Sequence, residues 1–137
     1  MDFLADTNVV SEIVKPLPDP KVIKWASDNK LAIVTSPIVL GEVRAGILFL
    51  PPGQRQNQLI DWFSRHVTQI TVVDFDAQSA MVWAELLAEM KRKGRTMPIK
   101  DSLIAATARQ HDLTIATRNI NDYRHAGVKL VDPFSTT

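Results

Sequence analysis

Short apolar runs alternate with segments of helical length along this chain, and this alternation constrains the fold more than any other feature of the sequence. The apolar runs are roughly three to five residues long, and each is followed by a stretch long enough for a helix. Short continuous apolar strands are typical of a parallel sheet whose faces are covered by helices. We therefore expect an α/β domain with a mainly parallel central sheet of four to five short strands, flanked by helices on both faces.

Prolines and capping residues set the expected boundaries of these elements. Ser36 followed by Pro37 is a strong helix start, and Pro51 with Pro52 ends that helix. Gly94 stands where a glycine commonly closes a helix. The expected strands are residues 3–5, 31–35, 69–73, 114–116 and 129–131, and the expected helices are residues 9–14, 20–28, 37–50, 55–65, 77–93 and 101–110.

Length and composition limit the class of protein. The 137 residues are the length of one domain, so we expect a single domain over residues 1–137. Cysteine is absent, which excludes a disulfide scaffold and a cysteine zinc site and fits the cytoplasm, where we expect the protein to act. No apolar run approaches the ~18 residues of a membrane span, and the N-terminal segment lacks the basic start of a signal peptide. The net charge of +1 argues against a protein that coats DNA non-specifically, although it allows a local basic patch.

Polar residues that follow the expected strands are candidates for a functional site, because ligands bind outside the carboxyl ends of parallel strands. Asp6 directly follows the strand at residues 3–5, where an aspartate can also serve simply as a helix N-cap. Asn119 and Asp122 follow the strand at residues 114–116, where turn chemistry also favours both residue types.

Glu42 falls inside the apolar stripe expected for its helix. It lies four residues after Ile38 and three after Val39, which places it on their face. A carboxylate on a core-facing stripe is costly unless a cation pairs with it or a metal binds it. The alternative is a glutamate at the edge of the stripe that pairs with a cation from another element, such as Arg65.

Asp101 begins the helix expected at residues 101–110. It precedes Ile104 by three residues and Ala105 by four, so it shares their buried face. Two simpler explanations stay open, namely an N-cap for this helix and an ion pair with the adjacent Lys100.

The combination of these acids carries the functional argument. Clustered carboxylates repel and raise one another's pKa, so such a cluster is stable mainly when a hard divalent cation neutralises it. Oxygen ligands suit Mg²⁺ or Mn²⁺ better than zinc. Three or four acids with one or two such ions are the equipment of phosphodiester hydrolysis. We expect Asp6 and Asp101 to contact the metal.

Four segments of the chain resemble the PIN-domain nucleases. They are LADTNVVSE at residues 4–12, SPIVLGEVRAG at 36–46, PIKDSLIAATA at 98–108 and TRNINDY at 117–123. The chain is more closely similar to the VapC-type toxins of bacterial toxin–antitoxin pairs, in their FitB-like subgroup. The resemblance covers nearly the whole chain, in order and at the expected spacing.

The resemblance implies the catalytic residues. The family's first three acids fall on Asp6, Glu42 and Asp101, and its fourth polar position falls on Asn119, Asp122 or both. If only Asn119 faces the metal, the site has three charged ligands and a second metal binds more weakly.

The resemblance also implies supporting residues and partners. Tyr123 stands where phenylalanine is more usual, a mild departure, and Thr7, Asn8 and Thr117 are expected to orient carboxylates or water. The implied activity is a Mg²⁺-dependent endoribonuclease in which metal-activated water attacks in line, leaving 3′-hydroxyl and 5′-phosphate ends. The implied partners are the RNA substrate, a second copy of the chain in a homodimer, and a cognate antitoxin that blocks the active site, with a larger toxin–antitoxin assembly also open.

Several other signals have a simple structural explanation beside a functional one. The run KRKGR at residues 91–95 suits either a phosphate backbone or a solvated helix end, and Arg118 and Arg124 flank the acidic segment as candidates for holding substrate. The long helix is expected to bury a stripe formed by Ala80, Met81, Ala84, Leu87 and Ala88. The three histidines (His66, His111, His125) lack metal-ligand spacing, and the three tryptophans (Trp25, Trp62, Trp83) suit core or dimer contacts.

Two rival functions remain at this point. A Mg²⁺ phosphohydrolase would usually carry a second aspartate two residues after its nucleophile, where this chain has Asn8 after Asp6. A non-catalytic nucleic-acid or protein interaction module would retain only a degenerate acidic site, and the intact Asp6, Glu42 and Asp101 argue against that.

Overall fold

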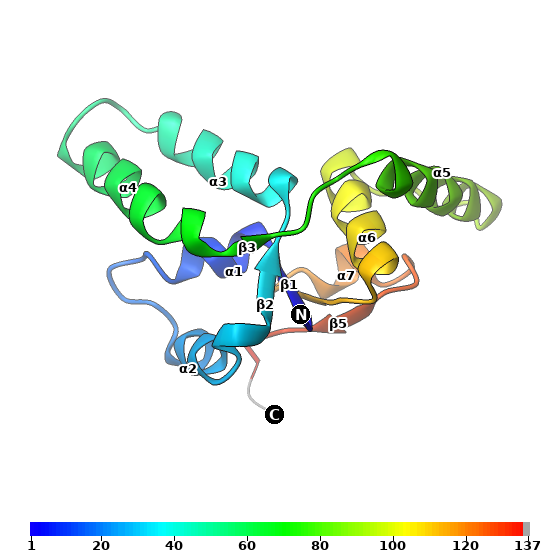
Figure 1. The fold of residues 1–137 in the computed structure, drawn as a ribbon, viewed down its shortest axis with the longest axis horizontal. Coiled ribbons are helices and arrows are strands. Elements are labelled where there is room, and N and C mark those ends of the chain that lie inside the picture. Colours follow the sequence, from blue (N-terminus) through cyan, green and yellow to red (C-terminus); the bar gives the residue numbers. More distant parts are fainter. Residues whose placement is uncertain (136–137) are drawn as a thin grey trace.

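Five short strands form one parallel sheet in the computed structural model, which describes residues 1–135 (Figure 1). The strand order is β3-β2-β1-β4-β5, and every neighbouring pair is parallel, as expected. The expected range of four to five strands is met at its upper end. The strands are β1 (Phe3–Ala5), β2 (Ile33–Thr35), β3 (Thr71–Val72), β4 (Thr114–Ala116) and β5 (Lys129–Val131).

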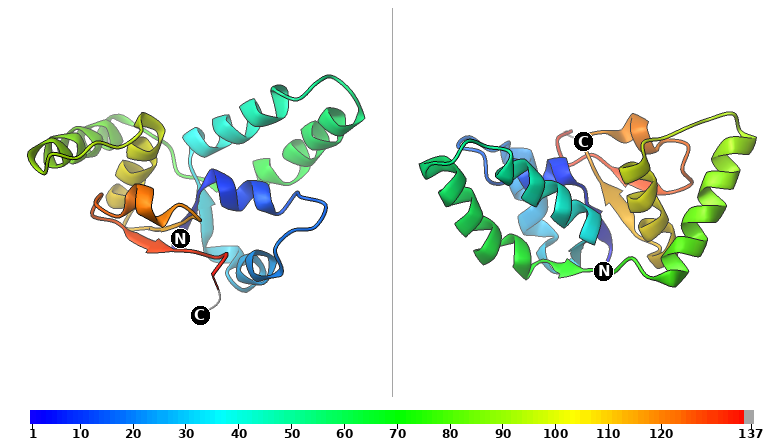
Figure 2. Two further views of the ribbon diagram at one scale, coloured as in Figure 1. Left: turned by 180° about the vertical axis from the view of Figure 1, so that it is seen from behind. Right: turned by 90° about the horizontal axis from the view of Figure 1, so that it is seen from above.

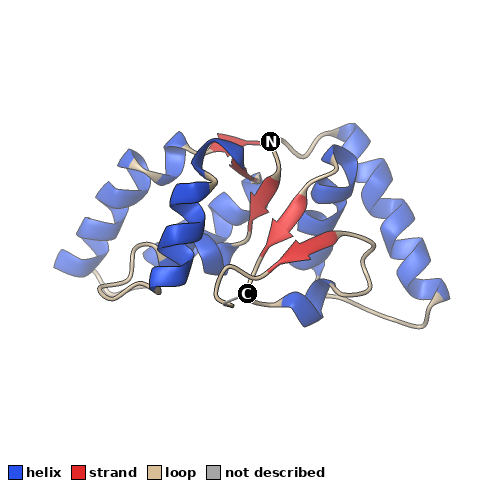
Figure 3. Ribbon diagram, turned by 90° about the horizontal axis from the view of Figure 1, so that it is seen from below, coloured by secondary structure: helices blue, strands red, loops and turns tan. Residues whose placement is uncertain are grey.

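Seven α-helices lie within the described residues and flank the sheet on both sides (Figure 3). The pair α3 and α4 projects to one side of the strands, and the pair α5 and α6 to the other (Figures 1 and 2). No helix in this part of the chain has the length and apolar character needed to cross a lipid bilayer. The helices are α1 (Thr7–Glu12), α2 (Pro20–Asp28), α3 (Pro37–Leu48), α4 (Gln54–Arg65), α5 (Ala77–Arg92), α6 (Ile99–His111) and α7 (Ile120–Tyr123).

Capping residues explain the helix starts that the sequence predicts well. The Ser36 hydroxyl accepts the backbone N–H of Val39, and Pro37 takes the first helical position of α3. Asp76 forms a capping box with Ser79 at the start of α5. Pro20 likewise begins α2 after the Asp19 cap.

Some boundaries differ from the expectation because single turns replace strand ends. Two 3-10 turns, Lys30–Ala32 and Val67–Gln69, precede β2 and β3 and shorten both strands. The helix expected from Asp101 begins earlier, at Ile99. The four-residue α7 was not expected, because it is too short to show a period of its own.

The buried face of α5 differs from the expected stripe. Ser79, Leu86 and Met90 are buried, whereas Ala84 is exposed and Met81 is 61% exposed. The buried face is the one that packs against α6. The expected alanine positions also repeat at helical period, so periodicity alone did not distinguish the two faces.

The tryptophans pack against the core, as expected for structural residues. The Trp25 ring meets the Phe3 ring edge-on, with centroids 5.2 Å apart. The indole N–H of Trp83 donates to the Ser102 hydroxyl at 2.8 Å, which satisfies its polar atom inside the α5–α6 contact.

The register of β1 and β4 sets the position of the site. Ala5 pairs with Ala116, so Asp6 and Thr117 leave the sheet side by side. The backbone N–H of Asp6 donates to the carbonyl of Ala116 at 3.0 Å and extends this pairing by one residue. The carboxyl edge of the sheet therefore carries the first acid and a hydroxyl in adjacent positions.

Candidate active site

Asp6 is a buried carboxylate with two separate tasks. Its Oδ1 atom accepts the Thr7 backbone N–H at 2.9 Å and caps α1. Its Oδ2 atom accepts the hydroxyls of Thr117 at 2.9 Å and Tyr123 at 3.2 Å. Burial raises the pKa of Asp6 above its usual value, although these three hydrogen bonds oppose the rise. The capping explanation is thus correct for one oxygen and leaves the other unexplained.

Asp101 lies in the first turn of α6 and does not cap it. The N-cap position is Pro98, and no side chain caps the helix there. The Tyr123 hydroxyl lies 3.4 Å from Oδ1 of Asp101. Burial, followed by the negative charges of Asp6 and Asp122, raises the pKa of Asp101 to about 6. The simple explanations of Asp101 as an N-cap or as the partner of Lys100 are therefore wrong.

Tyr123 links the two aspartates and is a site residue that the sequence reasoning treated as incidental. Its side chain is buried, and its hydroxyl is within hydrogen-bond distance of both Asp6 and Asp101. Burial and the two nearby carboxylates raise the pKa of Tyr123 far above its usual value, so the phenol keeps its proton. A phenol has a single proton, so it donates to one carboxylate at a time. The one sign of this role in the sequence is that Tyr123 carries a hydroxyl where phenylalanine is more usual in the family.

Glu42 sits at the edge of the core, with its side chain 22% exposed. Its Oε1 accepts the hydroxyl of Thr7 at 3.0 Å, and its Oε2 pairs with the Lys100 ammonium at 3.0 Å. The expected cation from another element is thus present, but it is Lys100 and not Arg65. Arg65 pairs instead with Asp61 on its own helix at 3.1 Å.

A polar network around Thr117 fixes the direction of its proton. The Thr117 hydroxyl oxygen accepts from the Asn8 side-chain amide at 3.1 Å and from the Asn119 backbone N–H at 3.0 Å. Its own proton then goes to Asp6. The Asn8 carbonyl oxygen in turn accepts the Arg118 backbone N–H at 2.9 Å. These contacts agree with the expected orienting positions of Asn8 and Thr117.

Asn119 and Asp122 both lie exposed at the rim of the site. Asn119 occupies the N-cap position of α7, yet its side chain does not cap the helix. The charge of Asp122 acts on Asp101 and raises its pKa. Of the two candidates for the fourth position, Asp122 is therefore the one whose charge reaches the acidic cluster.

The acidic side chains have the chemistry of a site for a hard cation, but they do not lie close enough together to form a complete metal site. Within residues 1–135, no three acidic or histidine side chains lie close enough together to hold an ion. Asp6 and Asp101 share one hydroxyl partner, and Glu42 is held by Lys100. All the donors are oxygens, and mutual repulsion contributes to the raised pKa values, so a divalent cation fits Asp6 and Asp101 chemically.

Glu12 is a second buried acid, and the sequence reasoning missed it. It pairs with Lys15 at 2.8 Å and with Arg118 at 3.6 Å, and it accepts the Asp19 backbone N–H at 2.9 Å. The Arg118 guanidinium also stacks 3.8 Å above the Phe134 ring. Arg118, expected as a candidate for holding substrate, is therefore engaged by the protein itself.

Comparisons with known proteins agree with this arrangement. The PIN domain family model matches residues 3–128. The chain is 32% identical to the toxin FitB of Neisseria gonorrhoeae, over 96% of this chain and 98% of that protein. It is 31% identical to the VapC ribonuclease Y4jK of Sinorhizobium fredii, over 96% of this chain and 97% of that protein. A solved structure of FitAB bound to the IR36 DNA fragment superposes with a TM-score of 0.91 at 30% identity, covering 98% of this chain and 97% of that one. The chain belongs to the PIN-domain family.

Proposed function

We propose that this protein is the toxin of a toxin–antitoxin pair and acts as a metal-dependent endoribonuclease. The carrying observation is the link Asp6–Tyr123–Asp101 at the carboxyl edge of a parallel sheet, with Glu42 beside it. Support comes from relatives of nearly equal length that are named a toxin and a VapC ribonuclease. A phosphohydrolase with an aspartate nucleophile gains no support, because Asn8 stands where such an enzyme usually carries a second aspartate.

The proposed metal is Mg²⁺ or Mn²⁺, held by Asp6 and Asp101. The support is the all-oxygen donor set and the pKa of Asp101, which burial and then the negative charges of Asp6 and Asp122 raise to about 6. When bound, the cation would acidify a water molecule and neutralise charge on the phosphate.

The other residues act by holding these carboxylates in place. The hydroxyls of Thr117 and Tyr123 fix the orientation of Asp6, and the Thr7 hydroxyl fixes Glu42. The ammonium of Lys100, which lies next to Asp101 in sequence, adds a positive charge at this edge of the site. Asn119 and Asp122 lie at the rim, where they can meet the RNA strand.

The proposed protein partners are a cognate antitoxin and a second copy of the chain. Leu17, Leu31 and Phe49 are apolar side chains that are 91%, 98% and 84% exposed, and such partners could cover them. The solved structure of FitAB with DNA gives a precedent for an assembly of this kind. We place the single domain of residues 1–137 in the cytoplasm.

The test is cleavage of a mixed cellular RNA pool by the purified chain with Mg²⁺, with Mn²⁺ and with EDTA. Asp101→Asn should abolish discrete cleavage, and Asp61→Asn is the matched control because Asp61 forms a surface ion pair with Arg65. Metal should raise the melting temperature of the parent and of the control but not of Asp101→Asn. Equal cleavage by all three proteins would contradict the proposal, and a chain that neither cleaves RNA nor binds metal would favour an interaction module.

A further inference from the structure

A polar pocket adjoins the acidic site between the end of α5 and α7. Its volume is about 530 Å³, and its walls include Arg95, Pro98, Asp122 and Arg124. Pro98 precedes Asp101 by three residues, and the charge of Asp122 acts on Asp101. The pocket, which we call the basic pocket, is thus continuous with the rim of the proposed active site.

The end of α5 explains why Arg95 lines this pocket. Gly94 has a φ of +66°, a left-handed conformation that closes the helix. The Arg95 backbone N–H then donates to the carbonyl of Met90 at 2.9 Å, and the Gly94 N–H donates to that of Lys91 at 3.0 Å. This pair of bonds is a Schellman motif, which turns the chain sharply and fixes Arg95 beyond the helix.

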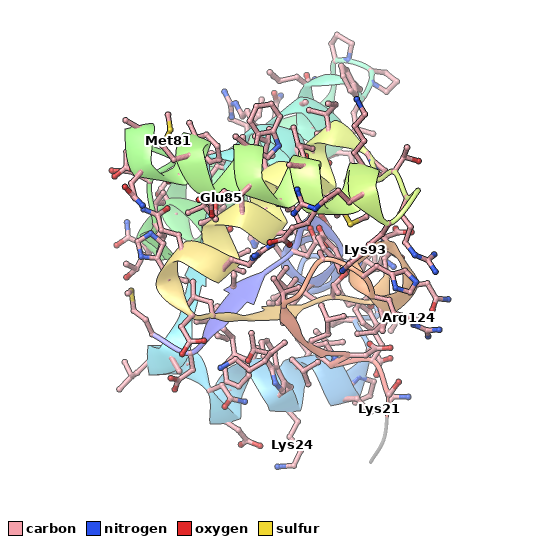
Figure 4. The ribbon with its side chains drawn as sticks, turned by 90° about the vertical axis from the view of Figure 1, so that its right-hand side faces the viewer. Lys21, Lys24, Met81, Glu85, Lys93 and Arg124 are labelled. Carbon is pink, nitrogen blue, oxygen red and sulfur yellow. The ribbon has the colours of Figure 1, made fainter. Side chains whose placement is uncertain are left out.

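Cations from two distant chain segments meet around this pocket. The Lys93 ammonium lies 3.5 Å from the backbone carbonyl of His125, and Lys93 and Arg124 lie on the same edge of the molecule (Figure 4). Partial burial, together with the positive charges of Arg95, Arg124 and Lys93, lowers the pKa of His125. The same cations therefore create a positive potential at the pocket.

The side chains of these cations are not tied up in ion pairs within the described residues. Within the described part of the chain, no acid forms an ion pair with Lys93, Arg95 or Arg124, whereas Arg109 pairs with Glu89 at 2.8 Å. The pocket wall carries one carboxylate, Asp122, at the side that faces the acidic site.

Solvation of a helix end accounts for only part of this cluster. Lys91 and Arg92 lie in the last turn of α5, where cations complement the helix dipole. Arg95 lies beyond the helix end, and Arg124 belongs to another segment, so neither is explained in this way.

We propose that the basic pocket binds a backbone phosphate of single-stranded RNA next to the phosphodiester that is cleaved, with Arg95 and Arg124 as its main contacts. The inference rests on the proposed function and adds to it a substrate-binding subsite. An unpaired arginine fork matches phosphate geometry, and the pocket volume lies in the range of small-ligand sites. The contact is to the phosphate, so it positions the strand without reading its sequence.

The test compares the parent chain with Arg95→Gln, Arg124→Gln and the double variant, and uses Lys21→Gln/Lys24→Gln on α2 as the matched control. Affinity for a single-stranded RNA oligonucleotide is measured by fluorescence anisotropy in an Asp101→Asn background, over a series of salt concentrations. We expect the double variant to bind about tenfold more weakly, with a salt slope smaller by about 1.4, because each lost contact removes about 0.7 for single strands. With the Asp101 carboxylate restored, KM for RNA should rise while kcat stays nearly unchanged.

The outcomes separate this inference from the proposed function. If the parent cleaves RNA and the double variant matches the lysine control in affinity, salt slope and KM, the basic pocket is not a substrate subsite. The proposed ribonuclease function would be supported all the same. Pocket-dependent binding of DNA alone would likewise overturn the inference. If the parent cleaves no RNA with any metal, the proposed function and the subsite both fail.

Discussion

The phenol oxygen of Tyr123 lies 3.2 Å from Oδ2 of Asp6, a contact that joins the last residue of α7 to the residue directly after β1. The same oxygen lies 3.4 Å from Asp101, so one buried hydroxyl connects two carboxylates from distant parts of the sequence. This connection makes Tyr123 the centre of the acidic cluster and the first residue to test by substitution.

Removing the Tyr123 hydroxyl should change the pKa of Asp101 while the aromatic ring still fills its place in the core. Tyr123→Phe keeps the buried ring but removes the donor that lowers the pKa of Asp101, so that pKa should rise above about 6. The free energy of unfolding should fall by about 1–3 kcal/mol, because a hydrogen bond to a charged group is lost. Carboxyl-carbon NMR titration and urea unfolding measure the two effects. An unchanged pKa of Asp101 would show that the hydroxyl does not stabilise its ionised form.

The metal-free protein should lose stability as the pH rises through the range set by Asp101. The pKa of this carboxyl is about 6 in the folded chain and about 3.9 when unfolded, so the folded state binds more protons between these values. Its contribution to stability is therefore present below about pH 4 and is lost as the pH rises past about 6. Asp6, whose pKa is also raised, acts in the same direction.

Asp101→Asn isolates this contribution. In EDTA, the variant should be more stable than the parent at pH 7, and the difference should shrink toward pH 4, as followed by urea unfolding at a series of pH values. Asp61→Asn is the control, since its ion pair lies on the surface. A constant difference between Asp101→Asn and the parent at all pH values would contradict the raised pKa.

The sequence predicted where the site residues that follow the strands lie, but it did not predict which side chains they contact. Asp6 and Thr117 could be placed because the carboxyl ends of parallel strands meet at one edge, and the register of β1 with β4 confirms that they adjoin. Asp101 was placed on the correct face of α6, although the helix starts earlier than expected. The positions of short apolar runs along the chain and the periodicity of each helix are local properties that a single sequence carries.

The partners of these acids could not be predicted in the same way. Lys100 as the partner of Glu42 depends on how α6 meets α3, and Tyr123 depends on α7, a helix of four residues. Buried Glu12 depends on Arg118 and on the chain after α1. Such contacts join elements far apart in sequence, and periodicity within one element says nothing about them.

The ion pair between Lys100 and Glu42 should compete with metal binding. Lys100→Met removes a positive charge from the edge of the acidic cluster and frees Glu42, so the affinity for Mn²⁺ should rise about two- to tenfold. Stability without metal should change by less than about 1 kcal/mol, since Lys100 is largely exposed. Calorimetric titration with Mn²⁺ measures the affinity, and Lys24→Met, which breaks a surface pair with Asp28, is the control. Weaker binding by Lys100→Met would show that the lysine supports the metal site.

The turn that places Arg95 should depend on glycine at position 94. Gly94 has a φ of +66°, so an alanine there must adopt a left-handed conformation, and Gly94→Ala should lower the free energy of unfolding by about 1–2 kcal/mol. The cost comes from the local backbone conformation, because no more distant part of the described chain lies within 4 Å of an added Cβ. Gly46→Ala is the matched control, since Gly46 is exposed within α3 and equally uncrowded. That substitution should raise stability by roughly 0.5–1 kcal/mol, because alanine favours the helix. Urea unfolding of both variants measures the difference, and a Gly94→Ala chain as stable as the parent would mean that the end of α5 does not require the left-handed residue.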